Sequence, residues 1–198
     1  LAERFLLAHP PLGHDLAAVA EGFADFVADS VRPGGIKIRR TVVPRDAIVE
    51  ATRIDVAFRR AMLAPAERSL QLTAADAPRL PGAHLVWSRG FTLLDESWPL
   101  IALRHELPTP LGDHRAQLPT RHSGGPRPWV ICRSPEGLRV MPVLPLQAEL
   151  LRLLRSRSIG DALATLERSS GNTIAANAQR WFAEGIRYGF WTALVEVP

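Results

Sequence analysis

Apolar residues in the first third of the chain recur at helical spacing. Residues 14–29 carry apolar side chains three or four positions apart, and a second run of this kind extends from Pro44 to Met62. Pro44 suits a first helical turn and Asp46 is favourable near the positive end of the helix dipole, so the second run predicts a helix over 44–62. Its polar face is expected to be solvated and holds Arg45, Glu50, Arg53, Arg59 and Arg60.

Shorter apolar runs rich in β-favourable residues follow in the middle of the chain. Leu85–Trp87 and Phe91–Leu94 predict strands, and Trp98–Leu103 is a third run of this type. Residues 108–128 then contain five prolines and three glycines, a composition that neither a helix nor a central strand tolerates. We therefore expect a mixed, mainly helical region over 1–107, a Pro/Gly-rich loop over 108–128 and a C-terminal module over 129–198.

The C-terminal module has the pattern of a β-hairpin followed by three short helices. Apolar stretches at 129–133 and 138–143 flank Ser-Pro-Glu-Gly, which places Pro and Gly where a β-turn favours them. Helices are predicted from Pro145, after the capping residue Ser158 and beyond Gly171, with a closing strand over 191–197. The predicted fold class is α+β, with a winged-helix-like order of elements in the C-terminal module.

Length and charge restrict the class of protein. The 198 residues allow one large domain or two small ones, and the single cysteine, Cys132, excludes an internal disulfide. There are 24 basic residues against 20 acidic ones, an excess too small for a dedicated polyanion binder. No apolar stretch has the length of a membrane span and no signal peptide is visible, so we expect a soluble, cytoplasmic protein without membrane contact.

Candidate catalytic groups are few and isolated. The six histidines form no His-x-x-x-His pair, although Asp113, His114 and His122 can converge on a metal ion, which keeps a metal-dependent hydrolase as one alternative. Cys132 can act as a nucleophile only beside a base such as His122, and its place inside a strand favours a buried thiol instead. We expect no catalytic residues, no metal and no cofactor in this chain.

A protein without catalytic residues acts by binding, and the predicted hairpin suggests how. A free strand edge carries unpaired backbone N–H and C=O groups, which an extended peptide can complete. Side chains at alternate strand positions then supply specificity. The candidate peptide-binding residues are Leu138, Arg139, Val140, Met141 and Pro142 on the second strand, with Leu150 and Leu154 on the helix that follows.

Several stretches of the chain resemble a known family. In the first half they are Val43–Ala47, Leu85–Ser88 and Trp98–Leu100; in the second half they are Leu146–Leu151, Ser158–Leu163 and Trp181–Ile186. These stretches resemble a family named for DNA binding, whose members are encoded beside multinuclear non-haem iron oxidative enzymes. The likeness covers residues 40–195 and consists mainly of apolar spacing rather than polar signatures.

The resemblance implies an accessory role. Members of the family form a heterodimer with a TIM-barrel-like, iron-dependent oxidase, which holds the iron. They help to bind the leader of a ribosomally made precursor peptide, whose cysteines become oxazolone and thioamide groups, as in the biosynthesis of the copper chelator methanobactin. The resemblance supplies no catalytic residue for this chain.

The expected anchors for the oxidase subunit are aromatic and arginine-rich, because interfaces are enriched in such residues. They are Trp87, Trp98, Arg104, His105, Arg121 and Trp129. The alternative function is a winged-helix DNA-binding transcriptional regulator. In that case the third helix of the C-terminal module would present Asn177, Gln179, Arg180 and Arg187 to the bases.

Overall fold

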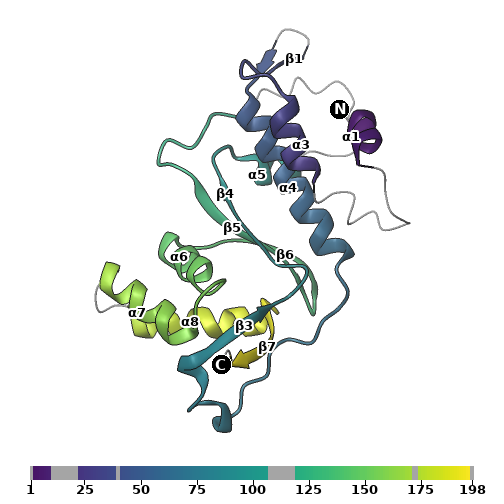
Figure 1. Cartoon of the computed structure of the whole chain (residues 1–198). Helices are drawn as coiled ribbons and strands as arrows, with labels where there is room; N and C mark the ends of the chain where they lie inside the picture. Colours follow the sequence, from purple (N-terminus) through teal and green to yellow (C-terminus); the bar gives the residue numbers. More distant parts are fainter. Residues whose placement is uncertain (1, 10–21, 39–40, 107–118, 171–173, 197–198) are drawn as a thin grey trace. The chain divides into compact units, whose positions relative to one another are not determined.

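The computed structural model describes residues 2–9, 22–38, 41–106, 119–170 and 174–196 (Figure 1). It is a mixture of helices and short sheets, which confirms the α+β class. The chain divides into two compact units: an N-terminal unit of residues 1–60 and 94–127, and a C-terminal unit of residues 61–93 and 128–198. The expected boundary near residue 128 is present, but the assignment of 61–93 to the N-terminal region is wrong.

The N-terminal unit consists of helices and one small hairpin. Its elements are α1 (Ala2–Ala8), α3 (Phe23–Ser30), β1 (Ile36–Ile38), β2 (Thr41–Val43), most of α4 (Arg45–Leu63) and α5 (Leu100–Glu106). The helix predicted over 44–62 is confirmed as α4. Of the helix predicted over 14–29, residues 14–21 lie outside the described residues, and the remainder corresponds to α3.

Helix α3 is tied to α4 by apolar contacts and by one arginine. Val27, Val31 and Val49 form a buried cluster between the two helices. The Arg45 Nε donates to the carbonyl oxygens of Ala28 at 2.9 Å and Val31 at 3.1 Å. The last carbonyls of a helix lack partners within it, so this guanidinium caps α3. The expectation of a solvated side chain is therefore wrong for Arg45.

The apolar run at 98–103 starts a helix instead of continuing as a strand. The backbone N–H of Ile101 donates to Glu96 Oε1 at 2.7 Å, and the N–H groups of Ser97 and Trp98 donate to the Glu50 carboxylate at 2.8–2.9 Å. These carboxylates satisfy amides at and before the start of α5, where negative charge is favourable. Glu50, also expected to be solvated, therefore has a structural role.

The C-terminal unit follows the predicted order of hairpin, three helices and closing strand. Its elements are β3 (Ala83–Trp87), the start of β4 (Thr92–Glu96), β5 (Arg127–Ser134) from Pro128 onward, β6 (Gly137–Pro142), α6 (Pro145–Leu153), α7 (Ile159–Ser170), α8 (Ile174–Arg187) and β7 (Trp191–Glu196), with short 3-10 turns at Ala74–Asp76 and Leu80–Gly82. Strand β7 pairs antiparallel with β3, in the register Leu85↔Leu194. This pairing brings residues 61–93 into the unit.

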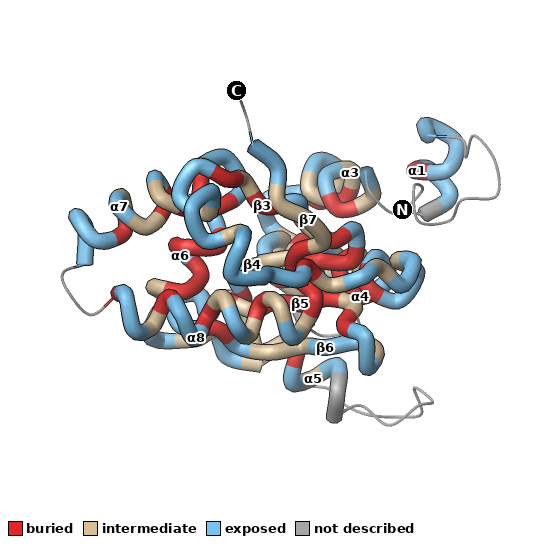
Figure 2. Tube along the Cα trace, turned by 90° about the horizontal axis from the view of Figure 1, so that it is seen from below, coloured by how far each residue is buried: buried red, intermediate tan, exposed pale blue. Residues whose placement is uncertain are grey.

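The core of the C-terminal unit lies between its helices and strands. Figure 2 shows buried positions along α6, α8 and β5. The core is rich in aromatic rings, with Phe190 and Trp191 each only 1% exposed. Helix α8 approaches Trp191 at Gly185, where an added Cβ would lie 2.3 Å from the indole Cζ3 atom. No larger residue fits at this position without moving the ring.

The helix signals of this unit are local and are confirmed. Ser158 Oγ accepts the N–H of Asp161 at 3.2 Å, as expected of a residue that caps α7. Pro145 occupies the first turn of α6. Across the part of the chain that the structure describes, no helix combines the length and apolar character needed to cross a bilayer.

Candidate functional site

The β5–β6 hairpin forms as predicted and leaves β6 at a sheet margin. The two strands pair antiparallel from Trp129↔Pro142 to Ser134↔Gly137, with Pro135 and Glu136 in the turn. The sheet has the order β4-β5-β6, so β5 is the central strand. Among the residues that the structure describes, no strand pairs with the outer edge of β6. The edge expected from the sequence is therefore present.

One hydrogen bond identifies the backbone groups that face outward from β6. The Val143 N–H donates to the Pro128 carbonyl oxygen at 3.0 Å. In an antiparallel ladder, hydrogen-bonded pairs alternate with pairs that are not bonded to each other. In this register the β6 residues whose backbone groups bond to β5 are therefore Gly137, Arg139 and Met141. The intervening residues direct their backbone groups away from β5.

The outward groups form a specific set of donors and acceptors. Leu138 and Val140 each present one N–H and one C=O, and Pro142 presents only its C=O. Proline at position 142 does not cost the hairpin a hydrogen bond, because the backbone nitrogen of this residue points away from β5. It also marks the end of the donor row, since the residue has no N–H. An extended peptide can form a ladder along Leu138–Pro142.

The side chains of β6 fall into two rows. Leu138, Val140 and Pro142 share one face, and Leu138 is 36% exposed. On the other face, Arg139 forms an ion pair with Glu136 and its guanidinium lies 5.8 Å from the centre of the Tyr188 ring. Met141, also on that face, packs against the core. The first row, together with Arg139, is available to a peptide.

Leu150 and Leu154 do not line a groove. Their side chains are 1% and 2% exposed and belong to the core of the C-terminal unit. The expectation that they contact a peptide is therefore wrong. Helical periodicity identifies the apolar face of α6 correctly, but it does not show that this face is already covered by the unit itself.

The Cys132 thiol is buried on the core side of β5. Its Sγ lies 3.8 Å from the Tyr188 carbonyl oxygen, which it faces as a weak donor. Burial raises the pKa of Cys132 from 9.0 to about 12, although the positive charge of Arg139 lowers it in part. A thiol in this state is protonated at neutral pH and is a poor nucleophile.

The three tryptophans proposed for the partner interface are half-buried. Trp87 packs against Phe91 with ring centres 4.5 Å apart, and Arg155 lies 5.2 Å above its ring. Trp98 follows β4, and Trp129 lies opposite Pro142 in the hairpin. Trp87 packs against the core of the C-terminal unit, and each of the three side chains leaves only part of its surface exposed to a partner.

The charged residues proposed for the partner interface differ in how strongly they already contact other residues of the chain. Arg104 forms an ion pair with Asp55 and lies 4.3 Å above the Phe58 ring. Arg121 is 59% exposed and only 3.8 Å from a carboxylate oxygen of Asp46, which is itself 52% exposed. His105 belongs to α5, and its side chain lies outside the described residues. Arg121 is therefore the more accessible of the two arginines.

A buried polar pair in the N-terminal unit was missed by sequence analysis. His122 Nε2 lies 3.4 Å from Glu96 Oε2, with the two side chains 10% and 3% exposed. The backbone N–H of His122 also donates to the Ser97 carbonyl oxygen at 2.9 Å. The pair connects the Pro/Gly-rich loop to the end of β4. No local signal predicts it, because the two residues are 26 positions apart.

The metal site considered from the sequence lies partly outside the described residues. His122 is engaged with Glu96, whereas Asp113 and His114 lie outside the described residues. Within the described ranges, no group of three His, Cys, Asp or Glu side chains is arranged to hold a metal ion.

The helix considered for DNA contact is α8. Its inner face, which includes Ile174, Ala178 and Trp181, is buried in the core. Gln179, Arg180 and Arg187 are exposed, and Arg180 donates to Asn177 Oδ1 at 3.0 Å. Three of the four residues singled out from the sequence are therefore exposed on α8, and the fourth, Asn177, is half-buried.

Comparison with known proteins identifies no relative. No family model matches the chain, and neither does any curated protein or any solved structure.

Proposed function

We propose that this chain is a non-catalytic accessory subunit that binds an extended peptide along the outer edge of β6. The observation that carries the proposal is the set of outward backbone groups on Leu138, Val140 and Pro142, which no described strand pairs. Unpaired donors and acceptors at a strand edge are a template for strand addition. The main-chain ladder supplies affinity, and the adjacent side chains select the peptide.

The side chains beside this edge suit a peptide with apolar and acidic residues. Leu138 and Leu144 are 36% and 54% exposed, and both lie at or just after β6. Arg139, which faces the opposite side of the strand, is ion-paired with Glu136 and has further guanidinium N–H donors for a carboxylate. A peptide strand with apolar residues on one face and a carboxylate on the other complements both rows.

We further propose that the peptide is the leader of a ribosomally made precursor and that the chain forms a heterodimer with an iron-dependent oxidase. In this proposal the oxidase, and not the accessory chain, holds the iron and converts precursor cysteines to oxazolone and thioamide groups, as in methanobactin biosynthesis. The family-like stretches along the sequence support this assignment. Of the two arginines proposed for the oxidase contact, Arg121 has the more exposed side chain and is the better candidate.

Co-purification tests this function. The chain is produced together with a multinuclear non-haem iron oxidase and its cysteine-containing precursor peptide, and the mixture is separated by size-exclusion chromatography. The proposal predicts an equimolar complex of chain and oxidase that retains the peptide. If the chain elutes as a monomer and leaves the oxidase and the peptide unbound, the proposal is wrong.

A DNA-binding regulator is the second candidate, favoured by the exposed Gln179, Arg180 and Arg187 on α8. Such a regulator would read base edges with side chains on the helix and neutralise DNA phosphates with its arginines. Its binding to DNA would therefore weaken strongly as the salt concentration rises. A mobility-shift assay with genomic fragments at low salt separates the two functions. A shift that weakens with salt supports the regulator, and no shift at low salt excludes it.

A further inference from the structure

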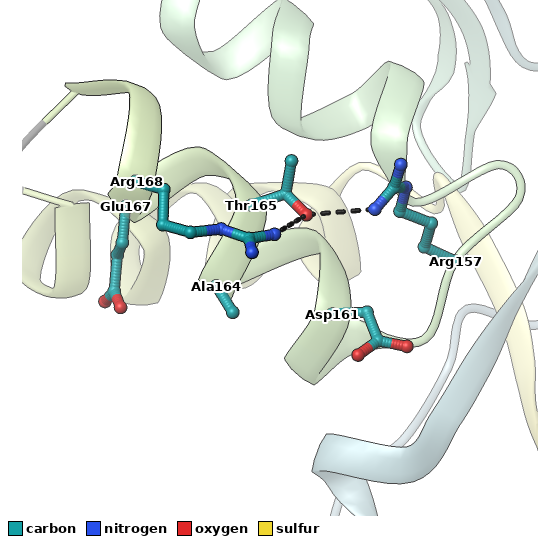
Figure 3. A pocket seen from close by; sticks show the side chains of 6 residues that line it. All are labelled: Arg157, Asp161, Ala164, Thr165, Glu167 and Arg168. Carbon is teal, nitrogen blue, oxygen red and sulfur yellow. Dashed lines mark hydrogen bonds between the residues drawn. The ribbon is translucent and has the colours of Figure 1, made fainter.

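A second polar surface lies on α7 of the C-terminal unit. Figure 3 shows the guanidinium groups of Arg157 and Arg168 directed toward the Thr165 hydroxyl from two sides. Arg157 Nη1 donates to Thr165 Oγ1 at 3.0 Å, and Arg168 Nη2 donates to the same oxygen at 3.2 Å. Both lone pairs of the hydroxyl are thereby used, and its proton is left to donate.

The two guanidinium groups converge without a carboxylate between them. Asp161 and Glu167 line the same open hollow of about 510 Å³, but Figure 3 shows both carboxylates directed away from the Thr165 hydroxyl. In the described part of the chain, neither acid forms an ion pair with Arg157 or Arg168. Two positive groups on one neutral oxygen repel each other, and an anion between them would replace this repulsion with attraction.

We propose that Arg157, Thr165 and Arg168 bind a carboxylate side chain of an acidic polypeptide segment. A carboxylate accepts hydrogen bonds from guanidinium groups in a fork and has a further lone pair for the hydroxyl proton. Arg157 and Arg168 are both exposed, so the hollow does not enclose a small free ion. A carboxylate carried on a polypeptide is held there by the rest of the contact.

Nucleic acid fits this surface less well than an acidic peptide. Asp161 and Glu167 flank the arginines on α7 and would repel the successive phosphates of a nucleic-acid strand. A peptide with flexible glutamate side chains can place one carboxylate between the arginines and direct its other carboxylates away from both acids, which the regularly spaced phosphates of a strand cannot do. The proposal extends beyond the peptide edge of β6 and does not depend on it.

Titration of the whole isotope-labelled chain by NMR tests the proposal, with acetyl-triglutamate amide as the probe and acetyl-triglutamine amide as its neutral control. The Nε–H signals of Arg157 and Arg168 are expected to shift and to saturate with triglutamate only. Arg157→Gln or Arg168→Gln should each weaken binding about tenfold, the effect of losing one charge-assisted hydrogen bond. Arg180→Gln removes the same charge from α8 and should leave binding unchanged.

Three results would overturn the proposal. One is the absence of saturable shifts at millimolar triglutamate. Another is an equal loss of triglutamate binding in Arg157→Gln, Arg168→Gln and Arg180→Gln, which would show that binding depends only on the net charge of the chain. The third is tighter binding of a single-stranded oligonucleotide that the first two variants abolish, which would assign the surface to nucleic acid. Circular dichroism confirms that each variant is folded.

Discussion

The Val143 N–H donates to the Pro128 carbonyl oxygen at 3.0 Å, and this bond fixes the direction of every backbone group along β6. Because the register is continuous from Trp129↔Pro142 to Ser134↔Gly137, Leu138 and Val140 direct their N–H groups away from β5. The candidate peptide site is therefore a property of the backbone. It can be blocked without removing any hydrogen bond of the hairpin.

Val140→Pro should abolish strand addition while preserving the fold. The substitution removes an outward donor and places a ring at the edge, whereas the β5–β6 ladder keeps its bonds. Peptide affinity should fall at least about tenfold and the free energy of unfolding should change by less than about 1.5 kcal/mol. Fluorescence anisotropy with a labelled leader peptide, together with urea unfolding, measures the two effects.

Val140→Ala is the matched control, because it removes the same side chain but keeps the N–H. It should retain most of the peptide affinity. Met141→Pro removes a donor that bonds to β5 and should destabilise the hairpin itself. Equal affinities for Val140→Pro and the unmodified chain would exclude peptide pairing along this edge.

Gly185→Ala should destabilise the C-terminal unit. A Cβ at this position would lie 2.3 Å from Trp191 Cζ3 in a fully buried ring. Overpacking of this kind costs about 1–3 kcal/mol, more than the roughly 1 kcal/mol that alanine gains over glycine within a helix. Urea unfolding measures the change. Adding Trp191→Phe to Gly185→Ala should recover part of the lost free energy of unfolding. If it does not, the destabilisation does not arise from contact with the Trp191 ring.

Glu96→Ala should destabilise the N-terminal unit by about 1–3 kcal/mol. The change leaves the buried N–H of Ile101 and the ring of His122 without their acceptor. Glu96→Gln retains a carbonyl oxygen for Ile101 and should cost less. Thermal unfolding of the two variants gives the comparison, and similar stability for both would show that the hydrogen bond to Ile101 contributes little.

Cys132 should be unreactive in the folded chain at neutral pH. Burial raises the pKa of its thiol to about 12, so the unfolded chain, with a pKa near 9.0, loses this proton first as the pH rises. The thiol therefore has no effect on stability below about pH 8, and it reduces stability progressively between pH 9 and pH 12. Labelling with a thiol reagent at pH 8 should be slow and should become fast in urea. Rapid labelling of the folded chain would contradict the buried position.

The hairpin, the helices of the C-terminal unit and α4 could be predicted from the sequence because their signals are local. The Ser-Pro-Glu-Gly turn, the Ser158 cap and the apolar spacing of 44–62 each act within one element. The pairing of β3 with β7 could not be predicted, since its partners are about a hundred residues apart. The helix at 100–106 was missed for the same reason, because Glu50 supports its start from α4.

The candidate site was predictable only in part. Alternation along 138–142 placed the two rows of side chains correctly, because strand residues alternate by simple geometry. The same approach failed for Leu150 and Leu154, since an apolar helix face looks alike whether it meets a ligand or the core. The Arg157–Thr165–Arg168 surface was not foreseen, because Arg157 precedes α7 and reaches Thr165 only once the turn is formed.

Hydrogen exchange at two backbone amides tests the peptide edge most directly. In the free chain, the amides of Leu138 and Val140 should exchange rapidly, while those of Arg139 and Met141 should be protected by the ladder to β5. When the oxidase and the precursor leader are bound, Leu138 and Val140 should become protected by at least about tenfold. Protection of these two amides in the free chain, or unchanged rapid exchange in the complex, would contradict peptide pairing along β6.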